Sequence, residues 1–80
     1  MSIMFKESAF KHRIKREDIL CAFHNDHFDG PVEDEENKFL RLGFDRAGNL
    51  LEIMYNETEF EVTIFHAMAC RSIYYQLIDS

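Results

Sequence analysis

Hydrophobic residues in the first third of the chain recur at helical spacing and predict two helices. The first spans residues 7 to 13, with apolar residues inward and basic residues outward. The second runs from residue 17 to about residue 25, where the i, i+3, i+4 spacing marks one helical face. The residues on that face are Ile19, Leu20 and Phe23. Glu17 and Asp18 in the first turn suit the positive end of the helix dipole.

Alternation with a period of two replaces the helical spacing in the middle of the chain and predicts strands. Three segments alternate in this way: residues 38–44, 50–55 and 60–66. The DRAGN segment between the first two suits a hairpin turn. We expect Arg41 on the face opposite Leu40 and Leu42, and His66 on the same face as Val62 and Ile64. A further short strand is expected either around residues 27–29 or around Val32.

The last segment, residues 67–77, returns to helical spacing and predicts a closing helix. Its inward residues are Cys70, Ile73, Tyr74 and Leu77. The predicted fold is α+β: two N-terminal helices, a three- to four-stranded antiparallel sheet and a C-terminal helix, with the helices on one face of the sheet. A length of 80 residues indicates a single domain, residues 1–80.

Composition indicates a globular chain without a membrane segment. Hydrophobic residues make up 46% of it, with eight Phe and no Trp, which predicts a core of Phe, Leu and Ile. No apolar run is long enough for a signal peptide or a bilayer span, so a cytoplasmic location is expected. Cys21 and Cys70 lack C-x-x-C spacing and are expected as reduced core residues within helices.

Charge is unevenly distributed along the chain. The net charge is −6, which argues against non-specific binding to nucleic acid. Residues 6–16 nevertheless carry five of the nine Lys and Arg, whereas residues 26–36 carry six carboxylates and neither Lys nor Arg. The acidic run at residues 33–36 is either a solvated hairpin tip or a docking patch for a basic partner.

The junction of the last strand and the last helix holds the first candidates for catalysis: His66, Arg71, and Tyr74 or Tyr75. Metal-independent cleavage of RNA needs a base for the 2′-hydroxyl, an acid for the leaving oxygen and a cation for the phosphate. His66 or Tyr74 suits proton transfer, and Arg71 suits the phosphate. The structural alternative is that His66 is a hydrogen-bonded core residue and that Arg71 pairs with Glu52 across the sheet.

Further candidates are cationic. Lys11 and His12, followed by Arg13, form either a phosphate-contacting corner or a basic helix end. Arg41 is either an exposed residue available to RNA or a solvated one. His24 and His27 have metal-ligand spacing but no third ligand, so no metal is expected. No phosphate-binding loop, dinucleotide fingerprint or zinc-ribbon spacing is present, so no small-molecule cofactor is expected.

Three segments, SAFKH, DRAGNLLEI and HAMACRSIYY, follow one another in an order that resembles BrnT-like toxins, part of the RelE/ParE-like set of bacterial toxin–antitoxin proteins. The resemblance runs from residue 7 to residue 75. It implies an RNA-cutting toxin that inhibits translation, and a cognate antitoxin protein that neutralises it. Lys11, His12 and Arg71 are carried over as RNA-facing residues, whereas His66 is assigned from its own chemistry.

Two departures from the family pattern leave an alternative open. Arg13 stands where the family has glycine, and the closing segment keeps only Arg71 of several arginines. Together with the net charge of −6, this favours a non-catalytic interaction domain that binds a basic partner in its helix–sheet groove. The toxin hypothesis predicts that Lys11, His12, Arg41, Arg71 and at least one Tyr line a single concave surface.

Overall fold

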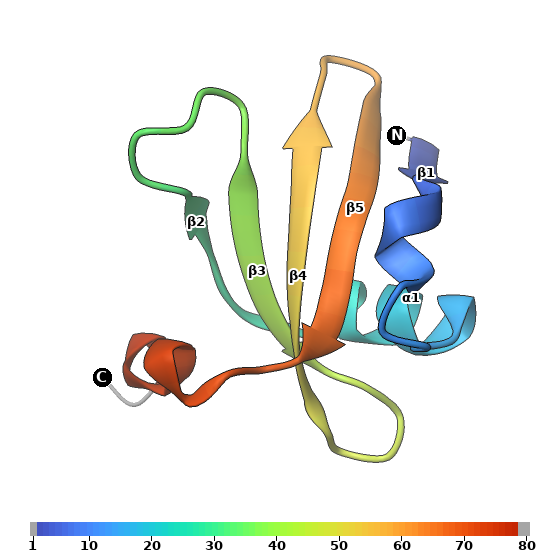
Figure 1. Ribbon diagram of the computed structural model, residues 1–80, viewed down its shortest axis with the longest axis vertical. Coiled ribbons are helices and arrows are strands. Elements are labelled where there is room, and N and C mark those ends of the chain that lie inside the picture. The colour runs from blue at the N-terminus through green and yellow to red at the C-terminus, as the bar shows by residue number, and fades with distance from the viewer. Residues whose placement is uncertain (1, 79–80) are drawn as a thin grey trace.

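A five-stranded mixed sheet forms the centre of the fold in the computed structural model, which describes residues 2–78 (Figure 1). The elements in chain order are β1 (Ser2–Phe5), the 3-10 helix η1 (Glu7–Phe10), α1 (Arg16–His24), β2 (Asp26–Pro31), β3 (Phe39–Phe44), β4 (Leu50–Glu57), β5 (Glu61–Ala69) and the 3-10 helix η2 (Ser72–Leu77). The sheet order is β1-β5-β4-β3-β2. β1 runs parallel to β5, and the other neighbours are antiparallel.

The predicted arrangement of two N-terminal helices, a purely antiparallel sheet and a C-terminal helix is wrong, and so is the RelE-like architecture attached to it. Residues 2–5 form an additional strand because they pair with β5, a partner some 60 residues away that local patterning does not reveal. The first predicted helix is a single 3-10 turn, followed by Arg13 with a positive φ of 64°. The sheet is therefore mixed, and α1 is the one α-helix of the protein within residues 2–78.

The predicted C-terminal helix is also wrong in its first part. β5 continues through Ala69, because Ala67 and Ala69 pair with Ile53 and Leu51 of β4. Only Ser72–Leu77 is helical, and it is a 3-10 helix. Cys70 therefore lies between β5 and η2 rather than in a helix, whereas Cys21 does lie in α1, and both are free thiols.

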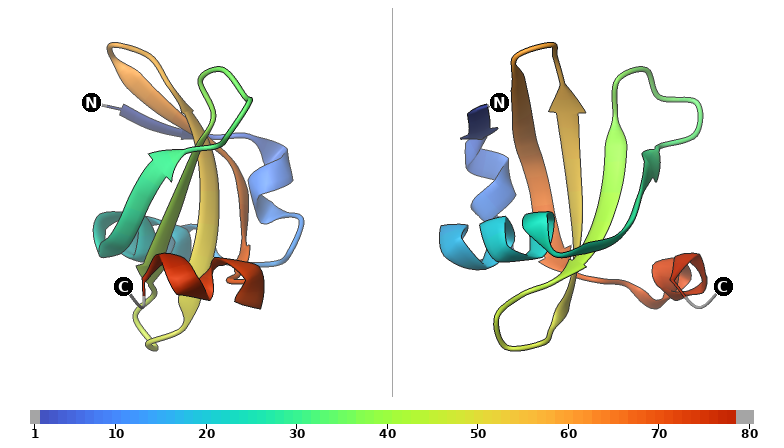
Figure 2. Two further views of the ribbon diagram at one scale, coloured as in Figure 1. Left: turned by 90° about the vertical axis from the view of Figure 1, so that its left-hand side faces the viewer. Right: turned by 180° about the vertical axis from the view of Figure 1, so that it is seen from behind.

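Helix α1 and η2 pack on opposite faces of the sheet, as the side and rear views show (Figure 2). On the α1 side, Ile19 and Phe23 pack with Ile53, Tyr55 and other residues of β4 and β5. On the other side, Tyr74 and Leu77 of η2 pack over Leu40 and Leu42 of β3 and Phe28 of β2. The prediction of a helix with Ile19 and Phe23 inward is confirmed, whereas Leu20, predicted on the same face, is only partly buried. The helices do not share one face of the sheet.

A β-bulge in β5 changes which face His66 occupies. Ile64 lies opposite Tyr55, yet His66 lies opposite Met54, the preceding residue of β4. Phe65 is therefore an extra residue, and the alternation of side chains reverses after it. The prediction that His66 shares a face with Val62 and Ile64 is wrong for this reason. His66 leaves the α1 face and joins the face of Glu52 and Met54.

Gly43 allows α1 to approach β3 closely. A Cβ on Gly43 would lie 1.9 Å from the carbonyl oxygen of Ala22 in α1. The backbone carbonyl of Asn25, which ends the helix, also accepts a hydrogen bond from the Phe44 backbone N–H at 3.3 Å.

No helix of the described residues is long and apolar enough to cross a membrane.

We predict that Gly43→Ala lowers the free energy of unfolding by about 1–3 kcal/mol or more, because the new methyl group displaces α1 from β3. Urea denaturation followed by circular dichroism measures the change. Gly30→Ala is the matched control, since its Cβ meets only the movable Phe28 ring at 3.1 Å. Equal losses in the two variants would contradict the tight packing of α1 on β3.

Candidate functional site

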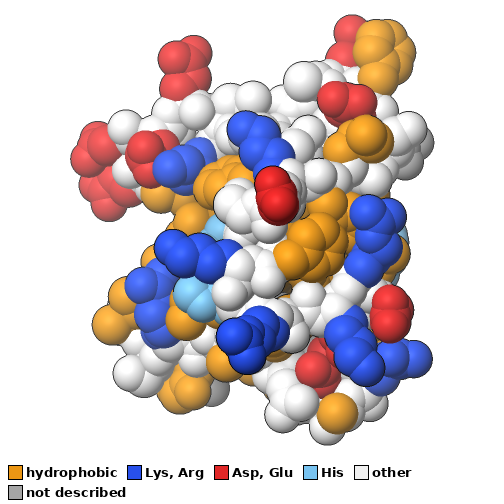
Figure 3. Space-filling model, turned by 45° about the vertical axis from the view of Figure 1, so that its right-hand side comes forward, with side chains coloured by type: hydrophobic (Ala, Val, Ile, Leu, Met, Phe, Trp, Pro, Cys, Tyr) orange, Lys and Arg blue, Asp and Glu red, His pale blue; other side chains and the backbone are white. Residues whose placement is uncertain are grey.

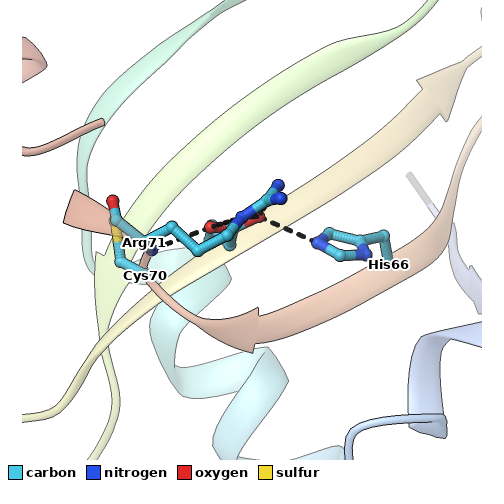
Figure 4. A network of polar contacts seen from close by, with 4 residues as sticks. His66, Cys70 and Arg71 are labelled. Carbon is cyan, nitrogen blue, oxygen red and sulfur yellow. Dashed lines mark hydrogen bonds and ion pairs between the residues drawn. The ribbon is translucent and has the colours of Figure 1, made fainter. Parts of the chain in front are cut away.

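Glu52, in the middle of β4, is the centre of the site. Its side chain is 0% exposed, and it is the one charged residue in the buried class within residues 2–78. An unpaired carboxylate in such a position would cost several kcal/mol, so its contacts decide the local structure. Figure 4 shows that two side chains from the end of β5 and the segment after it converge on it: His66 and Arg71.

Arg71 binds Glu52 through both its backbone and its side chain. Its backbone N–H and its Nε donate to Oε1 at 2.9 and 3.0 Å, and Nη2 donates to Oε2 at 2.8 Å. This is a two-pronged guanidinium–carboxylate contact, the strongest kind of side-chain ion pair. The interpretation that Arg71 pairs with Glu52 across the sheet is therefore confirmed. The Arg71 side chain is still 48% exposed, so one edge of the guanidinium faces solvent.

Glu52 also holds His66. The Nε2 of His66 lies 3.0 Å from Oε2 of Glu52. Because an ionised carboxylate only accepts, Nε2 carries the proton, and Nδ1 is the nitrogen left for proton transfer. The His66 side chain is 22% exposed, so part of the imidazole faces solvent.

Hydrogen bonding keeps Glu52 ionised. Burial alone raises the pKa of the carboxyl, but the hydrogen bonds from the Arg71 side chain and backbone, with that from His66, outweigh burial and bring the pKa below its ordinary value. The same carboxylate raises the pKa of Arg71. The charges of Glu52 and Arg71 are therefore fixed across the physiological pH range.

His12 brings a second imidazole to the site. Its ring centroid lies 5.6 Å from that of His66, with the ring planes at 79°. The hydroxyl of Ser8 in η1 donates to the Phe65 carbonyl at 2.6 Å and so attaches the segment before His12 to the bulge of β5. Lys11 is exposed beside His12. The KH pair of the sequence thus lies at the same edge of the sheet as His66.

Tyr74 borders the site from η2. Its ring centroid lies 5.6 Å from the guanidinium carbon of Arg71, within the range of a cation–π contact. Tyr75 is 48% exposed and lines a separate cavity with His27 and Phe44. Of the two tyrosines considered from sequence, Tyr74 is therefore the one in contact with the catalytic candidates.

Arg41 lies on the opposite face of the sheet, so the prediction that it lines a single concave surface with Lys11, His12, Arg71 and a tyrosine is wrong. Its guanidinium stacks 3.9 Å from the Phe23 ring centroid, and Nη1 donates to the Phe23 carbonyl at 2.9 Å. It also pairs with Asp29, which accepts a hydrogen bond of 2.6 Å from the Tyr55 hydroxyl. Burial, together with this bond, raises the pKa of Tyr55 to about 12. Arg41 thus belongs to a network that joins α1 to β2, β3 and β4.

Two groups important to these networks were not among the predicted site residues. Glu52 was considered only as a partner of Arg71, and the Asp29–Tyr55 pair was not foreseen. A signal for Glu52 exists in the sequence, since it is the single charge within the strand LLEIMY. His24 and His27 pack edge-on against Phe23 and Phe44. No group of three or more potential metal ligands occurs within the part of the chain that the structure describes.

The charge distribution distinguishes two parts of the surface. Figure 3 shows Lys and Arg side chains, with His among them, spread over the side of the molecule that includes β5 and the N-terminal segments. Several carboxylates lie near the top of this view, and others lie among the Lys and Arg side chains. Residues 33–36 of the loop between β2 and β3 are all exposed acids. Comparison of the chain with models of known families, with curated proteins and with solved structures finds no match.

We predict that Glu52→Gln lowers the free energy of unfolding by about 1–3 kcal/mol at pH 7, because charge-assisted hydrogen bonds become neutral ones. Since the folded pKa of Glu52 is depressed, this stabilisation is fully present above the unfolded value of about 4.3 and is lost as pH falls through the folded pKa. Urea denaturation at pH 7 and at pH 3 measures the difference between wild type and variant.

The control for this prediction is Glu59→Gln, which alters an exposed carboxylate in the loop between β4 and β5. It should change stability by less than about 0.5 kcal/mol at either pH. If the difference in the free energy of unfolding between wild type and Glu52→Gln widened on acidification, Glu52 would not be ionised in the folded protein.

Proposed function

We propose that this protein is the toxin component of a bacterial toxin–antitoxin pair, a cytoplasmic RNA endonuclease of BrnT-like type that inhibits translation. The observation that carries the proposal is the constellation around one buried carboxylate. Glu52 orients an imidazole and a guanidinium, and a second imidazole lies 5.6 Å from the first. The order of the SAFKH, DRAGNLLEI and HAMACRSIYY segments supports the same reading. The proposal rests on these segments and on the site, not on a RelE-like fold.

The proposed chemistry needs an acid, a base and a cation. One imidazole takes the proton of the RNA 2′-hydroxyl, and the 2′-oxygen attacks phosphorus to form a 2′,3′-cyclic phosphate. The bond from phosphorus to the 5′-oxygen breaks, and the other imidazole, protonated at the start, gives its proton to that oxygen. His66 and His12 supply the two roles, because their rings are in contact, whereas the Tyr74 ring lies against Arg71.

Arg71 supplies the fixed cation. Nε and Nη2 bond to Glu52, so Nη1 is the nitrogen directed to a phosphate oxygen. Held in this way, the guanidinium stabilises the charge that develops on the phosphate without reorienting during the reaction. Glu52 and Tyr74 are positioning residues in this scheme. Lys11 binds another phosphate further along the RNA. Arg41 has no part in it because it lies on the α1 face.

A second candidate function is a non-catalytic interaction domain that binds a basic partner. The specific observation in its favour is the exposed acidic loop at residues 33–36, together with the net charge of −6. Under this alternative the Glu52 cluster stabilises the end of β5 and has no substrate. Cleavage of RNA by the purified protein distinguishes the two.

We predict that the purified protein cleaves single-stranded RNA and that His66→Ala and His12→Ala each lower the rate by about 10²–10⁴-fold, because each removes one proton-transfer group. Products should end in 2′,3′-cyclic phosphate. Gel analysis of an end-labelled RNA, with and without EDTA, measures both. The rate plotted against pH should be bell-shaped for wild type and lose one limb in each variant.

Arg46→Ala is the matched control, since Arg46 is exposed and pairs with Asp18 of α1 instead. Induced expression in bacteria without an antitoxin adds a cellular test, in which wild type and Arg46→Ala should arrest growth and Arg71→Ala should not. Arrest by Arg71→Ala as well would retain a toxin but remove Arg71 from its site. Normal growth of cells that express soluble wild-type protein, together with no cleavage of RNA by that protein in vitro, would favour the interaction domain.

A further inference from the structure

An apolar groove lies between η2 and the strands β2 and β3, on the sheet face opposite α1. Its cavity has a volume of about 220 Å³. Four large side chains form much of its wall: Phe28, Leu40, Tyr74 and Leu77. A cavity of about 150 Å³ in another protein accommodates benzene, so this groove suits one large apolar side chain. A drug-sized ligand would need a larger space.

The rim of the groove is acidic. Glu33 lines the cavity directly, and it begins the run of exposed carboxylates at residues 33–36. Lys38 pairs with Glu35 at 2.6 Å, but the other three acids of the run take part in no ion pair within residues 2–78. Such a rim repels the phosphates of RNA and attracts lysine and arginine.

The strand beside the groove also suits a peptide. β2 is the last strand on its side of the sheet, and Pro31 and Val32 at its end line the cavity. An extended segment can pair with such an edge strand and insert one side chain into an adjacent pocket. The apolar cavity, the acidic rim and the edge strand β2 therefore lie next to one another at this groove.

We infer that this groove binds a segment of a partner protein that presents one large apolar side chain flanked by Lys or Arg residues. The inference goes beyond the proposed function, because it requires no cleavage of RNA. It also connects the groove with the Glu52 site. Tyr74 both lines the groove and contacts Arg71, so a bound segment borders the Glu52 site and can restrict access to it.

The test uses a defined probe, the fluorescent peptide Gly-Lys-Lys-Ser-Leu-Ser-Lys-Lys-Gly, with the whole protein. Replacing the central Leu of the peptide by Ser should weaken binding about tenfold, because the apolar anchor is lost. In the protein, Glu33→Lys with Glu36→Lys should also weaken binding by about tenfold or more. The matched control, Glu7→Lys with Glu59→Lys, makes the same change in net charge at exposed positions outside the groove and should leave binding within about twofold.

Amide chemical-shift changes in a ¹⁵N-labelled protein locate the bound peptide, and they should centre on Phe28, Val32, Tyr74 and Leu77. Equal affinity for the Leu and Ser peptides, equal losses in the two double variants, or the absence of binding would overturn the inference. A 2′-O-methyl RNA that shifts the groove resonances in place of the peptide would assign the groove to RNA and also overturn it. Absence of RNA cleavage with peptide binding retained would remove only the proposed function.

Discussion

The structure around the end of β5 depends on the burial of one carboxylate. Glu52 has no access to water, and an ion in that environment is tolerated only when it is paired and hydrogen-bonded. Arg71 and His66 satisfy that requirement with four nitrogen donors, one of them a backbone N–H. The backbone contact fixes the place where the chain leaves the sheet, so the start of η2 is set by the same ion pair that orients the two candidate catalytic groups.

Two polar networks lie on opposite faces of the sheet, and they have different roles. On the α1 face, Asp29, Tyr55 and Arg41 join the helix to three strands, with the guanidinium packed on the Phe23 ring. In that network the Arg41 and Asp29 side chains are 20% and 35% exposed. On the other face, the Glu52 network leaves 22% of the His66 side chain and 48% of the Arg71 side chain exposed. The second network is the candidate site because it joins an imidazole to a guanidinium whose side chain is 48% exposed.

Charge is unevenly distributed along the face of the sheet that carries the Glu52 site and η2. We therefore expect different ligands at the two ends of this face. His12 and Lys11 extend the Glu52 site toward the basic N-terminal segment, which suits a polyanion. The groove beneath η2 ends at the acidic loop of residues 33–36, which suits a basic peptide. A net charge of −6 therefore does not decide the function, because exposed basic residues precede and follow His12 near the Glu52 site whereas exposed carboxylates lie beside the groove. Tyr74 lies between the two surfaces.

Local patterning in the sequence determined α1, the three central strands and the turn after β3, because helical and strand periodicities are properties of short segments. It also placed Arg41 opposite Leu40 and Leu42, and it selected His66 and Arg71 by their chemistry. Tertiary structure decided the rest. The pairing of β1 with β5, the bulge at Phe65 and the extension of β5 through Ala69 all arise from hydrogen bonds between distant segments. The bulge turns His66 toward Glu52, and no periodicity within residues 60–66 encodes that reversal, because it is the pairing with β4 that makes Phe65 an extra residue.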